Sequence, residues 1–106
     1  MAAGRPTRVP GDLDTLAEML SCGEASAPAL VVLRRHDAWV VTVSEPELAA
    51  APDTLAACGG PVTTPSGAAG LAGAVAALGT PARARQLGLD VDSRLLILVT
   101  EGPLPA

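Results

Sequence analysis

The sequence predicts an α/β fold, a partial three-layer sandwich in which helices pack on a short, mostly parallel sheet. Two runs predict the strands. Residues 94–99 are almost entirely apolar, as in a strand buried on both faces, and residues 38–43 are rich in β-branched and aromatic side chains. Two long strands are few for the helices that surround them. The chain therefore either pairs its strands with another copy or forms a segment of a larger sheet.

The first two helices are predicted from their start signals. Asp12 or Asp14 can cap a helix that ends before residues 21–24. Ser26 starts a second helix with Pro28 in its first turn, where proline is tolerated. Positive residues at the end of this second helix suit the helix dipole.

The next helix follows the strand at residues 38–43. Ser44 with Glu47 three residues later is the pattern of a capping box. We expect the helix to reach Ala57 or Cys58, with Pro52 either kinking it or splitting it in two. A short extended piece then leads to the central stretch of the chain.

That stretch, residues 65–78, has no charge and consists mainly of Ala and Gly. We expect Ser66 to cap a helix there that is covered on nearly all sides. The stretch is too short for a membrane span, which needs about 20 apolar residues. Its start could bind an anion, although a Walker loop is excluded because the chain has no Lys. A buried packing helix is the simplest interpretation, and a further helix follows over residues 81–87, ended by Gly88.

Length, charge and cysteine content limit the possible domain number, partners and location of the protein. At 106 residues, the chain is a single domain or a segment of one. Its net charge of −4 and scattered arginines argue against nucleic acid as a partner. Without a secretory signal we expect a soluble cytoplasmic protein, with Cys22 and Cys58 as free thiols. The two cysteines and His36 match no zinc spacing, and the helix dipole explains His36 at a helix end.

Five motifs follow one another along the chain. They are Gly-Asp-Leu-Asp-Thr-Leu at 11–16, Leu-Ser-Cys-Gly-Glu at 20–24, Thr-Val-Ser at 42–44, Pro-Ser-Gly-Ala-Ala-Gly-Leu at 65–71, and residues 93–102. In this order they resemble the C-terminal part of pyridoxal-phosphate enzymes of fold type II, the serine/threonine dehydratase and tryptophan synthase β-like superfamily. The most similar members we can name are the diaminopropionate ammonia-lyases.

The resemblance implies β-elimination of ammonia or water from a small amino acid, with pyridoxal phosphate as cofactor. It places Thr100 at the cofactor's pyridine nitrogen, where a neutral hydroxyl would favour elimination. It also places Ser66 and Gly67 in a turn beside the cofactor. From the residues alone, Thr100 is equally a threonine at a strand end, and Ser66 a helix cap.

A second turn is implied beside the substrate. Cys22, Gly23 and Glu24 match it in the family. Without this match, Cys22 would be read as a small buried hydrophobe and Glu24 as a solvated acid.

Departures from the family limit the expected activity. The chain has no Lys, so no internal aldimine can form on its side chains. Cys58-Gly59-Gly60 is too short for the phosphate loop, and Thr64-Pro65 replaces the family's Glu. We therefore expect no catalytic residue in the chain itself, which would be inactive alone and a candidate complement to a Lys-bearing subunit.

Two alternatives stay open. The chain could be a non-catalytic, homo-oligomeric binding or assembly module derived from the same fold. It could also be a cofactor-free enzyme that uses Cys22, Glu24 or His36, although nothing beyond their presence favours this. Because unpaired strand edges and apolar helices would be exposed, we expect the monomer to be unstable.

Overall fold

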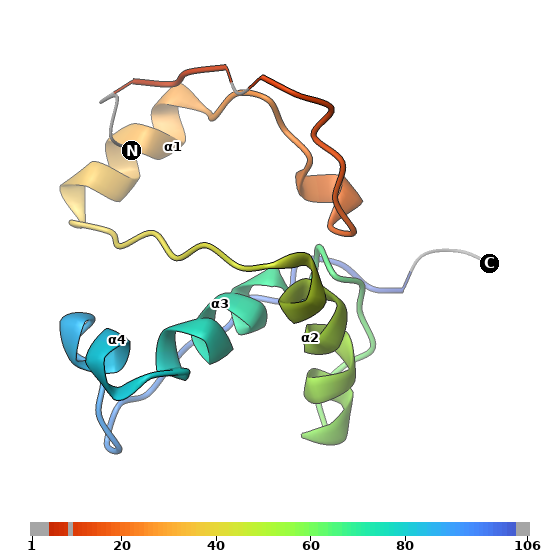
Figure 1. Cartoon of the computed structure of the whole chain (residues 1–106), viewed down its shortest axis with the longest axis vertical. Coiled ribbons are helices and arrows are strands. Elements are labelled where there is room, and N and C mark those ends of the chain that lie inside the picture. Colours follow the sequence, from red (N-terminus) through yellow and green to blue (C-terminus); the bar gives the residue numbers. More distant parts are fainter. Residues whose placement is uncertain (1–4, 9, 104–106) are drawn as a thin grey trace.

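The computed structural model describes residues 5–8 and 10–103. In this part the regular elements are all helical (Figure 1). They are the 3-10 helix η1 (Glu18–Leu20) and the α-helices α1 (Ala27–Arg35), α2 (Glu45–Ala57), α3 (Ala69–Leu78) and α4 (Pro81–Gln86). Helix α2 packs on α3, and α3 packs on α4, whereas α1 packs on no other helix within the described residues.

Hydroxyl side chains start three of the α-helices, and the sequence predicts two of these starts, at Ser26 and Ser44. The hydroxyl oxygen of Ser26 accepts a hydrogen bond from the Ala29 amide of α1, and that of Thr80 accepts one from the Arg83 amide of α4. At Ser44 both bonds of the capping box are present, since Glu47 also accepts from the Ser44 amide. Helix α2 runs through Pro52 without a break, so the alternative of a split helix is wrong.

The first predicted helix is almost absent. Only η1 is helical there, because Leu13 has a φ of 57° and leaves the helical region. The carboxylate of Asp12 accepts from the Asp14 amide, and the hydroxyl of Thr15 accepts from the Ala17 amide. Such local bonds compete with helix formation.

The central helix begins later than predicted. Residues 65–68 form a turn, and α3 starts at Ala69 with no side-chain cap. The prediction that Ser66 caps this helix is therefore wrong, because its hydroxyl accepts a hydrogen bond from the Met19 amide instead. The helix is also not covered on all sides, since Val75 is 52% exposed.

The predicted sheet is also wrong: the described residues contain no strand. Ladder hydrogen bonds need a neighbouring strand at about 4.8 Å, and each predicted strand runs along a helix instead. Residues 39–42 lie against α4. Ile97 and Leu98 pass Gly70 at the start of α3. The helices thus pack on one another, and the expected α/β sandwich does not form.

The core is small and built mainly from alanine. Its buried members are Ala17, Leu48, Ala51, Ala68 and Ala72. Many large apolar side chains stay exposed, among them Trp39 at 64% and Leu96 at 86%. Because so little apolar area is buried, the hydrophobic contribution to the stability of the chain is small.

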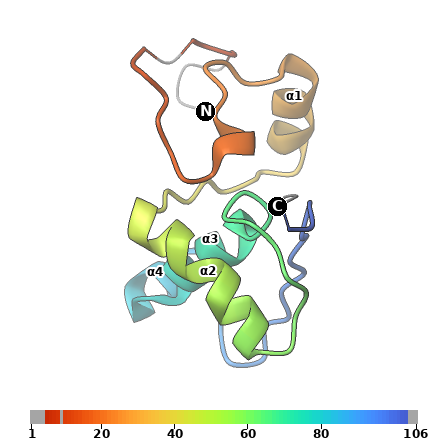
Figure 2. The same cartoon turned by 90° about the vertical axis from the view of Figure 1, so that its right-hand side faces the viewer.

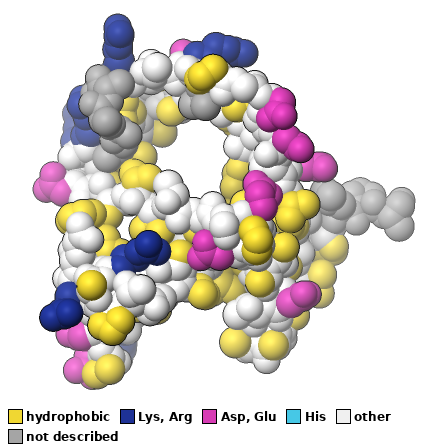
Figure 3. Space-filling model, in the orientation of Figure 1, with side chains coloured by type: hydrophobic (Ala, Val, Ile, Leu, Met, Phe, Trp, Pro, Cys, Tyr) yellow, Lys and Arg dark blue, Asp and Glu magenta, His cyan; other side chains and the backbone are white. Residues whose placement is uncertain are grey.

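Most of the N-terminal region, residues 5–8 and 10–37, including α1, stands away from α2, α3 and α4 (Figure 2). The exception is the segment around Ala17, which packs with Leu48 and Ala72 in the core. The space-filling view shows an opening through the molecule between the two parts (Figure 3). Among the described residues, no helix has the length and apolar character that crossing a membrane requires.

Candidate functional site

The predicted cofactor residues Ser66 and Gly67 belong to residues 63–68, which we call the Ser66 turn. Three hydrogen bonds organise it. The Thr63 hydroxyl donates to the backbone carbonyl of Glu101 over 2.5 Å. The Thr64 hydroxyl donates to Glu101 Oε1 and accepts from the Gly67 amide, the latter at 3.1 Å. The turn is thereby fixed to the chain segment that follows Thr100.

Gly67 permits this close approach. A Cβ atom at position 67 would lie 2.0 Å from Thr63 Oγ1 and 3.1 Å from the carbonyl oxygen of Glu101. The first distance is far inside van der Waals contact, so a side chain at this position would push the turn away from Glu101. The position therefore requires glycine for packing.

Ser66 is 5% exposed and faces the N-terminal region. Its Oγ accepts a hydrogen bond of 3.1 Å from the Met19 amide. A cavity of about 180 Å³ lies beside it. The lining residues are Leu16, Glu18, Met19, Thr64, Pro65, Ser66 and Glu101. Hydroxyls and two carboxylates thus share a small, mainly apolar space.

The structure brings together only part of the predicted site. Thr100 is exposed and precedes Glu101, but it does not line the cavity. Cys22 and Glu24 are exposed as well and also lie outside its lining. Gly23 packs against Leu13, whose Cδ1 would lie 3.3 Å from an added Cβ. Ser66 and Gly67 therefore adjoin the segment of Thr100, whereas residues 22–24 form a separate loop.

Two carboxylates at the start of α2 have pKa values below the ordinary one. Glu45 Oε2 accepts from the Leu16 amide at 2.8 Å, and this bond, with a second from the Thr15 hydroxyl, lowers the pKa of Glu45. The bonds from the amide and hydroxyl of Ser44 lower the pKa of Glu47, with a smaller effect from the positive charge of Arg83. Hydrogen bonds to the charged form explain both directions.

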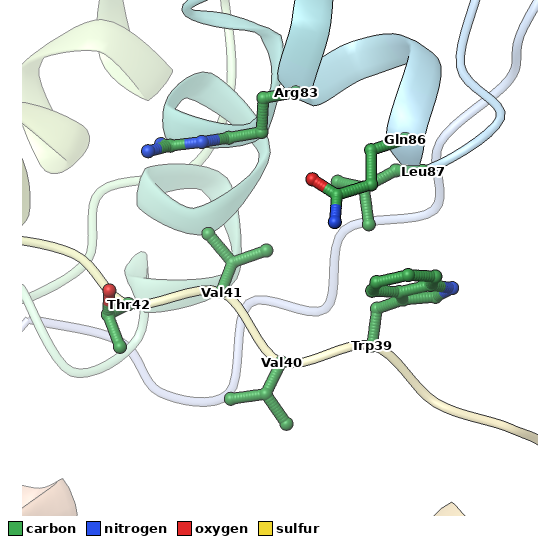
Figure 4. Close-up of a pocket in the computed structure, with 7 residues that line it drawn as sticks. All are labelled: Trp39, Val40, Val41, Thr42, Arg83, Gln86 and Leu87. Atoms are coloured by element: carbon green, nitrogen blue, oxygen red, sulfur yellow. The ribbon is translucent and has the colours of Figure 1, made fainter.

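A second cavity, of about 230 Å³, lies between residues 39–42 and α4. Trp39 and Val41 point toward α4 and Val40 points away (Figure 4). Arg83 and Gln86 supply the polar groups of its wall. The alternation of the side chains is that of extended chain, although no strand pairs with it in the described part.

Sequence reasoning missed two acidic residues that hold this architecture. Glu101 bonds to Thr64, and Glu45 bonds to Leu16. For Glu101, its place at the end of an apolar run was the available signal. For Glu45 the sequence offered only its role in the first turn of a helix.

The residues present do not make a complete site for pyridoxal phosphate. The chain has no Lys, and the interior of the Ser66 turn is filled by Thr63 and Glu101. A metal site is not evident either, since no group of three or more His, Cys, Asp or Glu side chains comes together in the described residues. Both cysteines are free and exposed.

Comparison with known proteins places the chain in a family. The profile described as "Pyridoxal-phosphate dependent enzyme" matches residues 1–101. No curated protein and no solved structure matches the chain. The family-level resemblance is confirmed by this match, and the cofactor of the family is pyridoxal phosphate, whereas the specific likeness to diaminopropionate ammonia-lyase stays a prediction. Because the match covers almost the whole sequence, the chain belongs to the pyridoxal-phosphate dependent enzyme family.

Proposed function

We propose that the chain is the C-terminal part of a pyridoxal-phosphate dependent lyase that eliminates ammonia or water from small amino acids. The observation that carries the proposal is the pair of bonds from Thr63 and Thr64 to Glu101. These bonds tie the two residues just before the motif at 65–71 to the motif at 93–102, more than thirty positions away in sequence. The family resemblance assigns both motifs to the surroundings of the cofactor.

Within this proposal the chain forms one wall of a site and another segment or subunit supplies the rest. The Schiff-base Lys and the phosphate loop would come from that second part, because this chain has no Lys. Thr100 is exposed and therefore free to face a group outside the chain. Ser66 and Gly67 would lie beside it, and residues 22–24 toward the substrate. By itself the chain would be inactive.

A pull-down of the tagged chain from its own cells tests the proposal. We expect a partner that carries a visible absorption band of bound pyridoxal phosphate, and release of ammonia when small amino acids are supplied. Thr100→Ala should shift that band. The matched control is Thr54→Ala, which removes an exposed hydroxyl from α2 and should leave the band in place. A colourless preparation with no such partner would contradict the proposal.

A second candidate is a non-catalytic module that binds other copies of itself. The exposed apolar residues of 38–43 and 94–99 favour it, because unpaired extended segments offer their backbone to another chain. Light scattering over a range of concentrations distinguishes the two. A colourless oligomer that Leu96→Arg dissociates would support the module, and a colourless monomer would exclude it.

A further inference from the structure

We propose that residues 15–20, which we call the strap, form a removable cover over the Ser66 turn. Opening of the strap would free the Ser66 hydroxyl and the cavity beside it. The strap is thus a conformational device within the chain. Its opening needs no cofactor. We add that opening would let the cofactor-bearing part of the enzyme reach Ser66, and this addition alone rests on the proposed function.

Two hydrogen bonds from backbone amides hold the strap, beside the bond from the Thr15 hydroxyl to Glu45. The Leu16 amide donates to Glu45 Oε2 over 2.8 Å, and the Met19 amide donates to Ser66 Oγ over 3.1 Å. Both acceptors are side-chain oxygens, and Glu45 is exposed to solvent. Water can replace the bond to Glu45 more readily than a bond inside a helix, because exposed groups are rehydrated at little cost. The bond to Ser66 is partly buried.

The strap contributes little apolar area to the core. Ala17 is 4% exposed and packs with Leu48 and Ala68, but it offers a single methyl group. The larger neighbours Leu16 and Met19 remain more than half exposed. Segments with few buried apolar contacts open locally at lower free energy than the core does.

Few other contacts hold the N-terminal region. Its helix α1 packs on no other helix in the described part of the chain. In the space-filling view an opening lies between part of this region and the rest of the molecule (Figure 3). Once the strap leaves, the region stays attached mainly through the covalent chain at residues 38–44. Release of a short segment would therefore move a much larger one.

In the closed state the strap occupies the site. The amide of Met19 donates its hydrogen bond to Ser66 Oγ. Leu16, Glu18 and Met19 form one side of the cavity. A group arriving from outside could not reach Ser66 without displacing these residues. The contact is in this sense autoinhibitory, and the strap has to open before Ser66 can serve a larger site.

Hydrogen–deuterium exchange of the full chain, without cofactor, tests the inference. We expect the amides of Leu16 and Met19 to exchange at least about tenfold faster than the Ala72 amide in α3, because the strap opens locally. Equal or slower exchange at the strap would overturn the proposal, since the strap would then open only with the core. This comparison uses the unaltered chain and needs no variant to fold.

Two matched variants identify the anchor. Glu45→Gln weakens the acceptor for the Leu16 amide and should speed exchange in the strap, with Ala72 unchanged. Glu47→Gln removes a charge from the same helical turn but not a strap contact, and should leave the strap rate unchanged. If both variants act equally, Glu45 is not the anchor and the inference fails. A strap that opens in a chain that captures no partner with a pyridoxal phosphate band would instead contradict only the proposed lyase function.

Discussion

The hydroxyl of Thr63 donates a 2.5 Å hydrogen bond to the backbone carbonyl of Glu101, across 38 positions of sequence. Thr63 is buried, so the bond is made away from solvent. A carbonyl that loses its partner in such a place is costly. This bond therefore decides whether the Ser66 turn and the end of the chain stay together.

Thr63→Val tests that bond with nearly unchanged shape. We expect the free energy of unfolding to fall by about 1–3 kcal/mol, because the Glu101 carbonyl is left without its donor. Thr54→Val is the control, since its hydroxyl is exposed and bonds only within α2. Urea denaturation measures both variants. Equal losses of unfolding free energy in the two variants would show that the bond to Glu101 does not contribute to stability.

Gly67→Ala should be disruptive for a steric reason. The added Cβ would meet Thr63 Oγ1 at 2.0 Å and the Glu101 carbonyl oxygen at 3.1 Å. We expect a loss of about 1–3 kcal/mol in the free energy of unfolding, as for other overpacked sites. Gly73→Ala is the contrast: a Cβ there meets nothing within 4 Å, and alanine should stabilise α3 by about 0.5–1 kcal/mol. A stabilising Gly67→Ala would refute the packing argument.

The two serine caps should differ in their effect on stability. Ser44→Ala removes the capping box of α2, which belongs to the core, and should lower the free energy of unfolding by about 1 kcal/mol. Ser26→Ala removes a longer bond of 3.4 Å from α1, a helix that packs on no other in the described residues. Thermal unfolding should detect the first loss and little of the second. The reverse order would mean that α1 is part of the cooperative unit.

These caps were predictable from sequence because each depends on residues within one turn. The same is true of Gly88, whose φ of 72° suits the end of α4. Ser66 was mispredicted because its actual partner, the Met19 amide, is 47 positions away. The strands failed for the same reason: extended segments become strands only when another segment pairs with them, and residues 39–42 lie on a helix instead. The caps of α1 and α2 could thus be predicted from local chemistry, whereas the choice of distant partner could not. The helix expected after Asp12 was a local failure, because bonds at Asp12 and Thr15 replace its first turns.

Acidification should loosen the strap. In the folded chain the Leu16 amide and the Thr15 hydroxyl lower the pKa of Glu45 below its ordinary value of 4.5. A carboxylate with a lowered pKa stabilises the folded state above that ordinary value, and this stabilisation is lost as the pH falls through the lower folded pKa. Exchange at the Leu16 amide, corrected for its intrinsic pH dependence, should therefore accelerate below pH 4.5. Glu45→Gln should abolish the extra pH dependence, whereas Glu47→Gln should retain it.

Trp39 offers a probe of the exposed segments, because it is the single tryptophan of the chain and is 64% exposed. In dilute solution we expect its fluorescence to be quenched efficiently by acrylamide. Any partner or second copy that covers residues 38–43 would remove the indole from water and reduce the quenching.

The cause of such a reduction can be identified. In a homo-oligomer the reduction in quenching should grow with concentration, and Leu96→Arg should prevent it if residues 94–99 share the interface. If quenching weakens only when a cofactor-bearing partner is added, residues 38–43 form the contact with that partner in the proposed lyase. Quenching that stays the same in both experiments would show that neither a second copy nor a cofactor-bearing partner covers residues 38–43.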